Sequence, residues 1–240
     1  MMAAPMTIRE HATQSSWRVE PLDAVGSTNQ ELLTRVDREL ATPGQVLIAR
    51  EQVAGKGRQG RTWRSSPGGL YMSSLIEDRE GWGSRWALVV GLAVHQAVAS
   101  AVPTAADHLA LKWPNDVMLH DRKLCGILIE RAGLHEPWWL VLGTGVNIVP
   151  PTEPAANASY LCDYRPSLTP ELLAPAILDA VDSLRNQFAK VGPDAIRRAW
   201  LAHGDACTFS GGALFDTPVF DRILLFYAVS MIPCWQEAMA

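Results

Sequence analysis

The sequence has few cysteines and none of the spacings that bind zinc. Four cysteines, at positions 125, 162, 207 and 234, are scattered over 240 residues, and none belongs to a C-x-x-C motif or has a suitably spaced histidine. We therefore expect no metal site. Isolated thiols are typical of a reducing compartment, and the first nine residues lack the pattern of a signal peptide. The sequence thus predicts a cytoplasmic protein.

An excess of positive charge is also absent. The chain carries 21 Lys and Arg against 25 Asp and Glu, a formal net charge of −4. A nucleic-acid backbone would repel the chain as a whole, which excludes non-specific nucleic-acid binding. Basic residues that gather at one place are therefore more informative.

No apolar run is long enough to predict a membrane span. The longest, WALVVGLAVHQAVASAV at residues 86–102, is about one turn short of a typical span and contains His95 and Gln96. This pattern predicts a buried core helix and no membrane partner. With 48% hydrophobic residues, the chain can form one sizeable core.

What the sequence does contain is a mixture of strands and helices in the order typical of an α+β domain. Thr28 and Glu31 have the spacing of a capping box and predict a helix start, with Gly44 ending that element. The polar turn at 120–123 predicts a hairpin. We expect strands at 17–22, 46–49, 69–75, 109–113 (extended by 117–119), 124–130 and 138–143, and further helices at 83–102, 169–192 and 193–202.

The stretch GKGRQGRTW at residues 55–63 contains a literal G-x-G-x-x-G. A dinucleotide-binding turn needs a helix that opens at the last glycine, and the following RTWRSSPGG is rich in turn residues instead. That interpretation is therefore rejected. Two others stay open at this point: an anion-binding loop, with backbone N–H groups and cationic side chains around a phosphate, or a solvated basic hairpin loop.

Three further polar clusters follow in the sequence. They are KWPND at 112–116, Lys123 with Gly126 in the next apolar run, and GTGVN at 143–147. Each alone fits an ordinary turn as well as a site. Together with the Gly-Arg loop they favour a site for an anionic ligand that bears a nucleotide.

The combination of Ser27-Thr28-Asn29, Gln52, GKGRQGRTW, KWPNDVMLHDRKLCGILIE and GTGVNI, in this order and spacing, closely resembles the catalytic domain of biotin protein ligases. The resemblance covers about residues 20–200. It implies an α+β fold with a mixed, largely antiparallel sheet, similar to class II aminoacyl-tRNA synthetases. It also implies a two-step reaction in which biotin and Mg-ATP form biotinyl-5′-AMP, and the biotinyl group then passes to a lysine of the biotin carboxyl carrier protein of acetyl-CoA carboxylase.

The resemblance also implies roles for residues. Arg58 and Lys123 would act at the acyl-phosphate junction, with Asp116 a candidate proton acceptor in the transfer step. Biotin would be bound by Ser27, Thr28, Asn29, Gln52, Gly55, Lys56, Arg58, Lys123 and Gly126, and the nucleotide by Arg58, Arg61, Trp63, Lys112, Asn115 and Asn147. The implied ligands are biotin, ATP and Mg²⁺.

The chain departs from the family at both ends. Only 26 residues precede Ser27, too few for the DNA-binding domain of some family members, so we expect no DNA partner. The 37 residues after His203 lack the pattern of the family's SH3-like barrel. We therefore divide the chain into a loose N-terminus (1–16), a catalytic domain (17–202) and a divergent or truncated segment (203–240). A lipoate or octanoate ligase, a catalytically impaired biotin binder and a homodimer stay open as alternatives.

Overall fold

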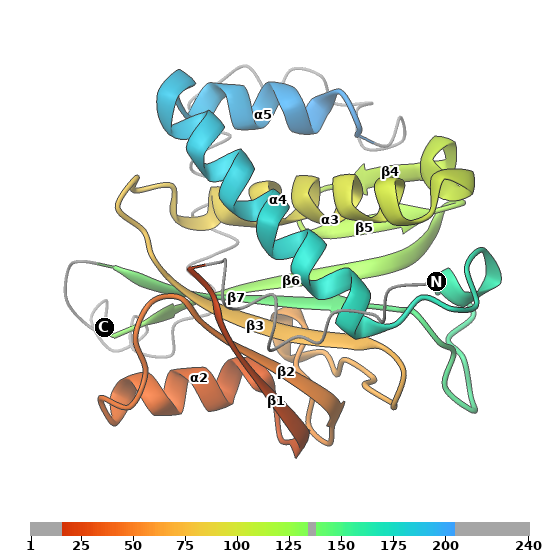
Figure 1. Cartoon of the computed structure of the whole chain (residues 1–240), viewed down its shortest axis with the longest axis horizontal. Helices are drawn as coiled ribbons and strands as arrows, with labels where there is room; N and C mark the ends of the chain where they lie inside the picture. Colours follow the sequence, from red (N-terminus) through yellow and green to blue (C-terminus); the bar gives the residue numbers. More distant parts are fainter. Residues whose placement is uncertain (1–15, 134–137, 205–240) are drawn as a thin grey trace, which may run out of the picture.

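The fold is built on one seven-stranded sheet with helices on both faces (Figure 1). The computed structural model describes residues 16–133 and 138–204. The strands lie in the order β1-β2-β3-β7-β6-β5-β4, and only the β1–β2 pair is parallel. The sheet is therefore mixed and largely antiparallel, as expected. The strands are β1 Arg18–Val25, β2 Gln45–Gln52, β3 Leu70–Glu77, β4 Leu109–Lys112, β5 Asp116–Leu119, β6 Arg122–Ala132 and β7 Trp139–Val146.

One face of the sheet is covered by the long apolar helix and the two that follow it. These are α3 Trp86–Ala101, α4 Pro170–Val191 and α5 Pro193–Leu201. Because side chains alternate across a strand, Val46 and Ile48 of β2 and Met72 and Ile76 of β3 face this side and join the main core. The helix expected at 83–102 is thus a buried core helix. No helix in the described part of the chain is both long and apolar enough to cross a bilayer.

Among residues 16–133 and 138–204, one α-helix covers the opposite face, α2 (Thr28–Asp37), with a smaller core beneath it. That core contains Leu32 of α2 with Leu47, Leu75 and Val141 of three neighbouring strands. Beyond the N-terminus of α2 the same face carries glycines and hydroxyl side chains. The face under α3 and α4 thus carries the main core, whereas the α2 face carries a smaller core and leaves room for a site.

Three details of the secondary structure differ from the expectation. The N-cap of α2 is Ser27, not Thr28, and the helix ends at Asp37, before Gly44. The Thr28 hydroxyl bonds to Gln52 and Ser73 of neighbouring strands, so the capping-box interpretation was wrong because tertiary partners take that hydroxyl. Residues 117–119 belong to a separate strand, β5, which folds back antiparallel on β4.

The remaining short elements connect these layers. They are the 3₁₀ turns η1 Arg58–Gly60, η2 Gly83–Arg85, η3 Pro103–His108 and η4 Leu161–Asp163. The hairpin expected at 120–123 joins β5 to β6, with His120 and Asp121 both at positive φ, as a tight two-residue turn requires. The predictions for residues 1–15 and for nearly all of 203–240 fall outside the described residues.

Candidate functional site

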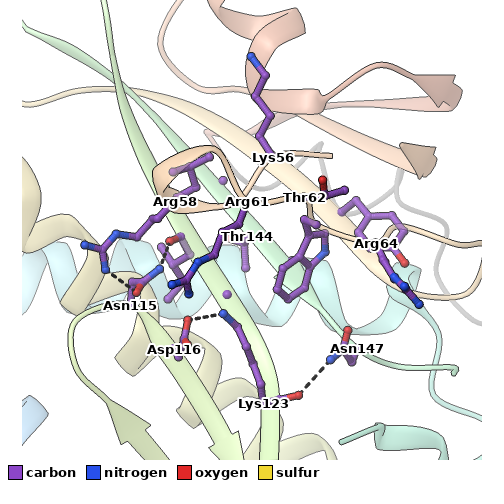
Figure 2. A pocket seen from close by; sticks show the side chains of 18 of the residues that line it. Lys56, Arg58, Arg61, Thr62, Arg64, Asn115, Asp116, Lys123, Thr144 and Asn147 are labelled. Atoms are coloured by element: carbon purple, nitrogen blue, oxygen red, sulfur yellow. Dashed lines mark hydrogen bonds and ion pairs between the residues drawn. The ribbon is translucent and has the colours of Figure 1, made fainter. Parts of the chain in front are cut away.

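A pocket of about 550 Å³ opens on the α2 face of the sheet (Figure 2). Its walls come from the N-terminus of α2, the Gly-Arg loop after β2, the turn between β4 and β5, the start of β6, the end of β7 and the loop that follows β7. Segments widely separated in the sequence therefore meet at one place. The lining carries five basic side chains (Lys56, Arg58, Arg61, Arg64, Lys123) and one carboxylate, Asp116. In a chain of net charge −4, this concentration of cations favours an anionic ligand.

The Gly-Arg loop folds back on itself over the pocket. Trp63 N–H donates to the Gly55 carbonyl at 2.9 Å, and Gly57 N–H donates to the Arg61 carbonyl at 2.7 Å. The tip is a 3₁₀ turn rather than a helix, with Gln59 at φ 56°. The rejection of a dinucleotide-binding turn is consistent with this geometry.

The basic side chains of the loop take different directions. Arg58 Nη1 donates to Asn115 Oδ1 at 2.8 Å and so ties the loop to the turn between β4 and β5. Figure 2 shows Arg58, Arg61 and Lys123 on the pocket side, whereas the Lys56 ammonium extends toward α2. It donates there to Gln30 Oε1 at 2.7 Å. Lys56 and Arg58 were both expected to contact biotin. The Arg58 guanidinium lies on the pocket side, whereas the Lys56 ammonium points toward α2.

Lys123 lies at the centre of a second group of contacts. Its Nζ is 2.7 Å from Asp116 Oδ1, with about a third of the lysine side chain exposed. The same ammonium lies 5.3 Å from the centre of the Trp63 ring. The Lys123 carbonyl accepts from Asn147 Nδ2 at 3.0 Å. Lys123 is thus a charged group held at a fixed place, and Asp116 is its acidic partner.

The Trp63 indole lies against a floor made by two glycines. Gly126 of β6 and Gly145 of β7 are direct cross-strand partners. A Cβ at Gly126 would lie 2.8 Å from Trp63 Cζ3, and one at Gly145 would lie 2.7 Å from Trp63 Nε1. Only glycine permits this approach at both positions. The Trp63 ring nitrogen is buried and has no hydrogen-bond partner among the described residues.

A hydrogen-bonded group forms the end of the pocket at α2. Gln52 Oε1 accepts from both the backbone N–H and the hydroxyl of Thr28, at 2.9 and 3.0 Å. Gln52 Nε2 donates to Ser65 Oγ at 2.8 Å. Ser27 caps α2 without a side-chain capping bond, although it is 95% buried and lines the pocket. This end can hydrogen-bond a compact polar group with several donors and acceptors.

Most of the predicted site residues meet in this pocket. The structure brings together Ser27, Thr28, Asn29, Gln52, Lys56, Arg58, Arg61, Trp63, Asn115, Asp116, Lys123, Gly126 and Asn147. Two predicted site residues are not among the lining: Gly55, which is buried at the start of the Gly-Arg loop, and Lys112, which is exposed at the end of β4. Lys112, which the resemblance assigns to the nucleotide, is therefore not part of the lining.

Sequence reasoning did not single out several residues that shape the pocket. Tyr71 lines it, and burial raises the pKa of its phenol to about 12, so it is neutral near pH 7 and donates to the Ser66 carbonyl at 2.7 Å. Ser73 is fully buried behind Thr28 and Asn29. The available signal was two adjacent serines in the otherwise apolar strand LYMSSLIE. Within residues 16–133 and 138–204, no group of three or more His, Cys, Asp or Glu is placed to hold a metal ion.

Comparisons with known proteins give a consistent set of similarities. The sequence model of the Biotin/lipoate A/B protein ligase family matches residues 22–147. A biotin–[acetyl-CoA-carboxylase] ligase of Paracoccus denitrificans is 35% identical over 193 residues, 73% of this chain and 76% of that protein. One of Mycobacterium tuberculosis is 38% identical over 157 residues, 62% of this chain and 57% of that protein. The chain thus spans only about half the length of several curated relatives it matches.

Solved structures show the same fold. The biotin protein ligase of Aquifex aeolicus in complex with biotin and ATP aligns with a TM-score of 0.67 at 26% identity, over 78% of each chain. That of Leishmania major in complex with biotinyl-5-AMP aligns with a TM-score of 0.67 at 28% identity, over 78% of this chain and 81% of that one.

Proposed function

Because the chain belongs to the Biotin/lipoate A/B protein ligase family, we propose that it activates biotin with ATP and transfers the biotinyl group to a lysine of a biotin carboxyl carrier protein. The observation that carries this proposal is the two-part character of the pocket. One end, at α2, offers neutral hydrogen-bonding groups, and the other gathers cations. Biotin has a neutral ureido ring at one end and a carboxylate at the other, which must meet the phosphates of ATP.

In the first step the biotin carboxylate attacks the α-phosphorus of ATP, giving biotinyl-5′-AMP and pyrophosphate. The carboxylate is ionised at neutral pH and needs no base. The obstacle is the repulsion between two anions, and positioned cations lower it by stabilising the charge of the transition state. Arg58 and Lys123 fit this role because their side chains are held at the pocket by Asn115 and Asp116.

Mg²⁺ would enter with the ATP phosphates and supply further positive charge to them. Among the described residues, no group of three or more His, Cys, Asp or Glu could hold the Mg²⁺ ion. Asp116 is the one carboxylate in the described pocket lining. We therefore propose that the phosphates provide most of its ligands. Trp63 offers an aromatic face for the adenine base, and Asn147 an amide close to Lys123.

In the second step the Nζ of the carrier lysine attacks the acyl carbon, forming an amide and releasing AMP and one proton. The free amine is the nucleophile, and an ordinary lysine is protonated near pH 7. Asp116 is the carboxylate nearest to Lys123 and is our candidate proton acceptor. We also propose that the chain works in the cytoplasm, where ATP is available.

The test is pyrophosphate release by the full 240-residue chain with Mg-ATP and biotin in the absence of carrier, with lipoate and octanoate as parallel acids. The proposal predicts release with biotin alone. Release with lipoate or octanoate instead would reassign the substrate within the family. Biotin binding without pyrophosphate release would indicate a biotin-binding protein that is not a ligase. Absence of both biotin binding and pyrophosphate release would overturn the proposal.

A further inference from the structure

The direction of the Lys123 side chain breaks the alternation of β6. Along a regular strand, successive side chains point to opposite faces of the sheet. Cys125 lies in the main core, whereas the next residue, Gly126, faces the Trp63 indole on the pocket side. Regular alternation would therefore direct Leu124 to the pocket and Lys123 into the main core. The structure shows the reverse, because Leu124 is fully buried in the main core and Lys123 lines the pocket.

A β-bulge causes this exchange of faces. The register between β5 and β6 shifts by one residue between Val117 and Met118, which leaves Leu124 of β6 unpaired in the β5 register. One extra residue on one strand reverses the faces of the residues on its far side. The Lys123 side chain is thereby turned over Gly126, where a Cβ would lie 3.2 Å from Lys123 Cε and 3.3 Å from its Nζ.

A short segment of the loop after β7, residues 157–159, pairs with β6 at the bulge. Lys123 N–H donates to the Asn157 carbonyl at 2.7 Å, and the Lys123 carbonyl accepts from the Ser159 N–H at 3.0 Å. The segment thus forms a parallel bridge with β6 at Lys123, beyond the last residue pair between β6 and β7. Both backbone groups of Lys123 are therefore bonded to this one segment.

The Ser159 side chain ties the same segment to β5. Its hydroxyl donates to the Leu119 carbonyl at 2.6 Å, and the residue is only 2% exposed, so water does not replace this bond. Leu119 is the last residue of β5, and its strand partner is Arg122, next to Lys123. Ser159 thus joins the two strands of the bulge, through its N–H on β6 and its hydroxyl on β5. It is not part of the pocket lining.

We propose that Ser159 is a positioning residue for adenylation, which fixes the β-bulge and so holds the Lys123 ammonium on the pocket face beside Asp116 (Figure 2). The inference rests on the proposed function, because Lys123 is one of the two cations assigned there to the transition state. Without the hydroxyl, residues 157–159 lose their bond to β5 and are free to shift. The Lys123 backbone, which is bonded to them at both its N–H and its carbonyl, would follow.

The first measurement is steady-state pyrophosphate release from Mg-ATP and biotin by the full chain. The proteins are the wild type, Ser159→Ala, Lys123→Ala and the double variant. The matched control is Ser74→Ala, which also removes a buried hydroxyl, 4% exposed, from a residue outside the pocket lining.

We expect Ser159→Ala to lower kcat by about tenfold with the KM for biotin unchanged, because a displaced cation stabilises the transition state less without affecting the biotin contacts at α2. The loss should be smaller than in Lys123→Ala, since the Asn147 side chain still donates to the Lys123 carbonyl. In the Lys123→Ala background, Ser159→Ala should cause no further loss, because Ser159 acts through Lys123. Ser74→Ala should keep the wild-type kcat.

The second measurement locates the Lys123 ammonium without any turnover. The chain has four lysines, and the three besides Lys123 are exposed: Lys56, Lys112 and Lys190. Reductive methylation with isotope-labelled formaldehyde therefore gives few NMR signals, and Lys123→Arg identifies the one from Lys123. In the wild type the Trp63 ring, whose centre lies 5.3 Å from Lys123 Nζ, should displace this signal from those of the exposed lysines. In Ser159→Ala the signal should move toward them, and in Ser74→Ala it should not.

A kcat for Ser159→Ala equal to that of Ser74→Ala would overturn the inference, as would a further loss in the Lys123→Ala background or an unmoved Lys123 signal. Ser159→Cys, whose thiol is only a weak donor, should show smaller changes in both measurements and replaces Ser159→Ala if that variant is unstable. A moved signal in a chain whose wild type releases no pyrophosphate would remove the proposed enzyme activity and leave the positioning of Lys123 standing. Release by the wild type with an unmoved signal would do the reverse.

Discussion

Substitution of Gly145 by alanine tests whether the glycine floor of the pocket positions the reacting groups. The new Cβ would lie 2.7 Å from the Trp63 ring, whereas ordinary van der Waals contact begins at 3.4 Å. The indole must therefore move by about 0.7 Å, the difference between these two distances. A displacement near 1 Å at an active site can reduce the rate by about a hundredfold, so we expect kcat/KM for biotin-dependent pyrophosphate release to fall by about tenfold to a hundredfold.

The stability of the fold should change little. Trp63 belongs to a loop and is free to shift, and alanine is no worse than glycine in a strand. We expect a change in Tm of less than about 3 °C, which for a chain of this size corresponds to about 1 kcal/mol. Gly91→Ala in α3 is the matched control, because its Cβ would meet its nearest neighbour at an ordinary 3.6 Å.

Two results would refute this reasoning. A rate for Gly145→Ala equal to that of Gly91→Ala would mean that the position of the indole does not matter to the reaction. A large fall in Tm in parallel with the rate would mean that Gly145 serves the sheet rather than the pocket.

Three further predictions concern single side chains. Arg58→Ala should reduce the rate of adenylation by about two orders of magnitude. Lys56→Ala removes only an exposed contact to Gln30 and should reduce this rate by less than about threefold. Equal losses of the steady-state rate in the two variants would contradict the role assigned to Arg58. Lys112→Ala should change the KM for ATP by less than about twofold relative to the wild type, because Lys112 is not in the pocket lining. A tenfold rise of this KM would instead support the nucleotide contact that the resemblance implies for Lys112. Burial and the neighbouring His203 lower the pKa of His95 from its ordinary 6.5 to about 4, so the unfolded chain binds a proton that the folded chain does not. The free energy of unfolding should therefore fall from pH 6.5 toward pH 4, by at most about 1.4 kcal/mol per unit; urea denaturation of His95→Gln should show a weaker dependence, and an unchanged slope would rule out this group.

The elements that the sequence predicted well are those whose signal is local. The helix at 83–102 was found from its continuous apolar character, and the β5–β6 hairpin from a short polar turn between apolar runs. The capping-box interpretation of Thr28 failed because its hydroxyl is taken by Gln52 and Ser73, which lie 24 and 45 residues away in the sequence. A local sequence pattern cannot predict competing hydrogen-bond partners that come close only in the folded chain.

The same distinction holds for the site. The sequence by itself determined the kinds of group available: a Gly-Arg loop, a lysine after a hairpin, and glycines in two strands. Only the tertiary structure decided how they act. It turned the Lys56 charge toward α2 and away from the pocket, and left Lys112 exposed at a strand end. It also turned Lys123 to the pocket face through the β-bulge at Leu124. The sequence states which residue types are available to a site. The direction of a charged side chain or of a hydrogen bond depends on partners that come together only when the sheet has formed.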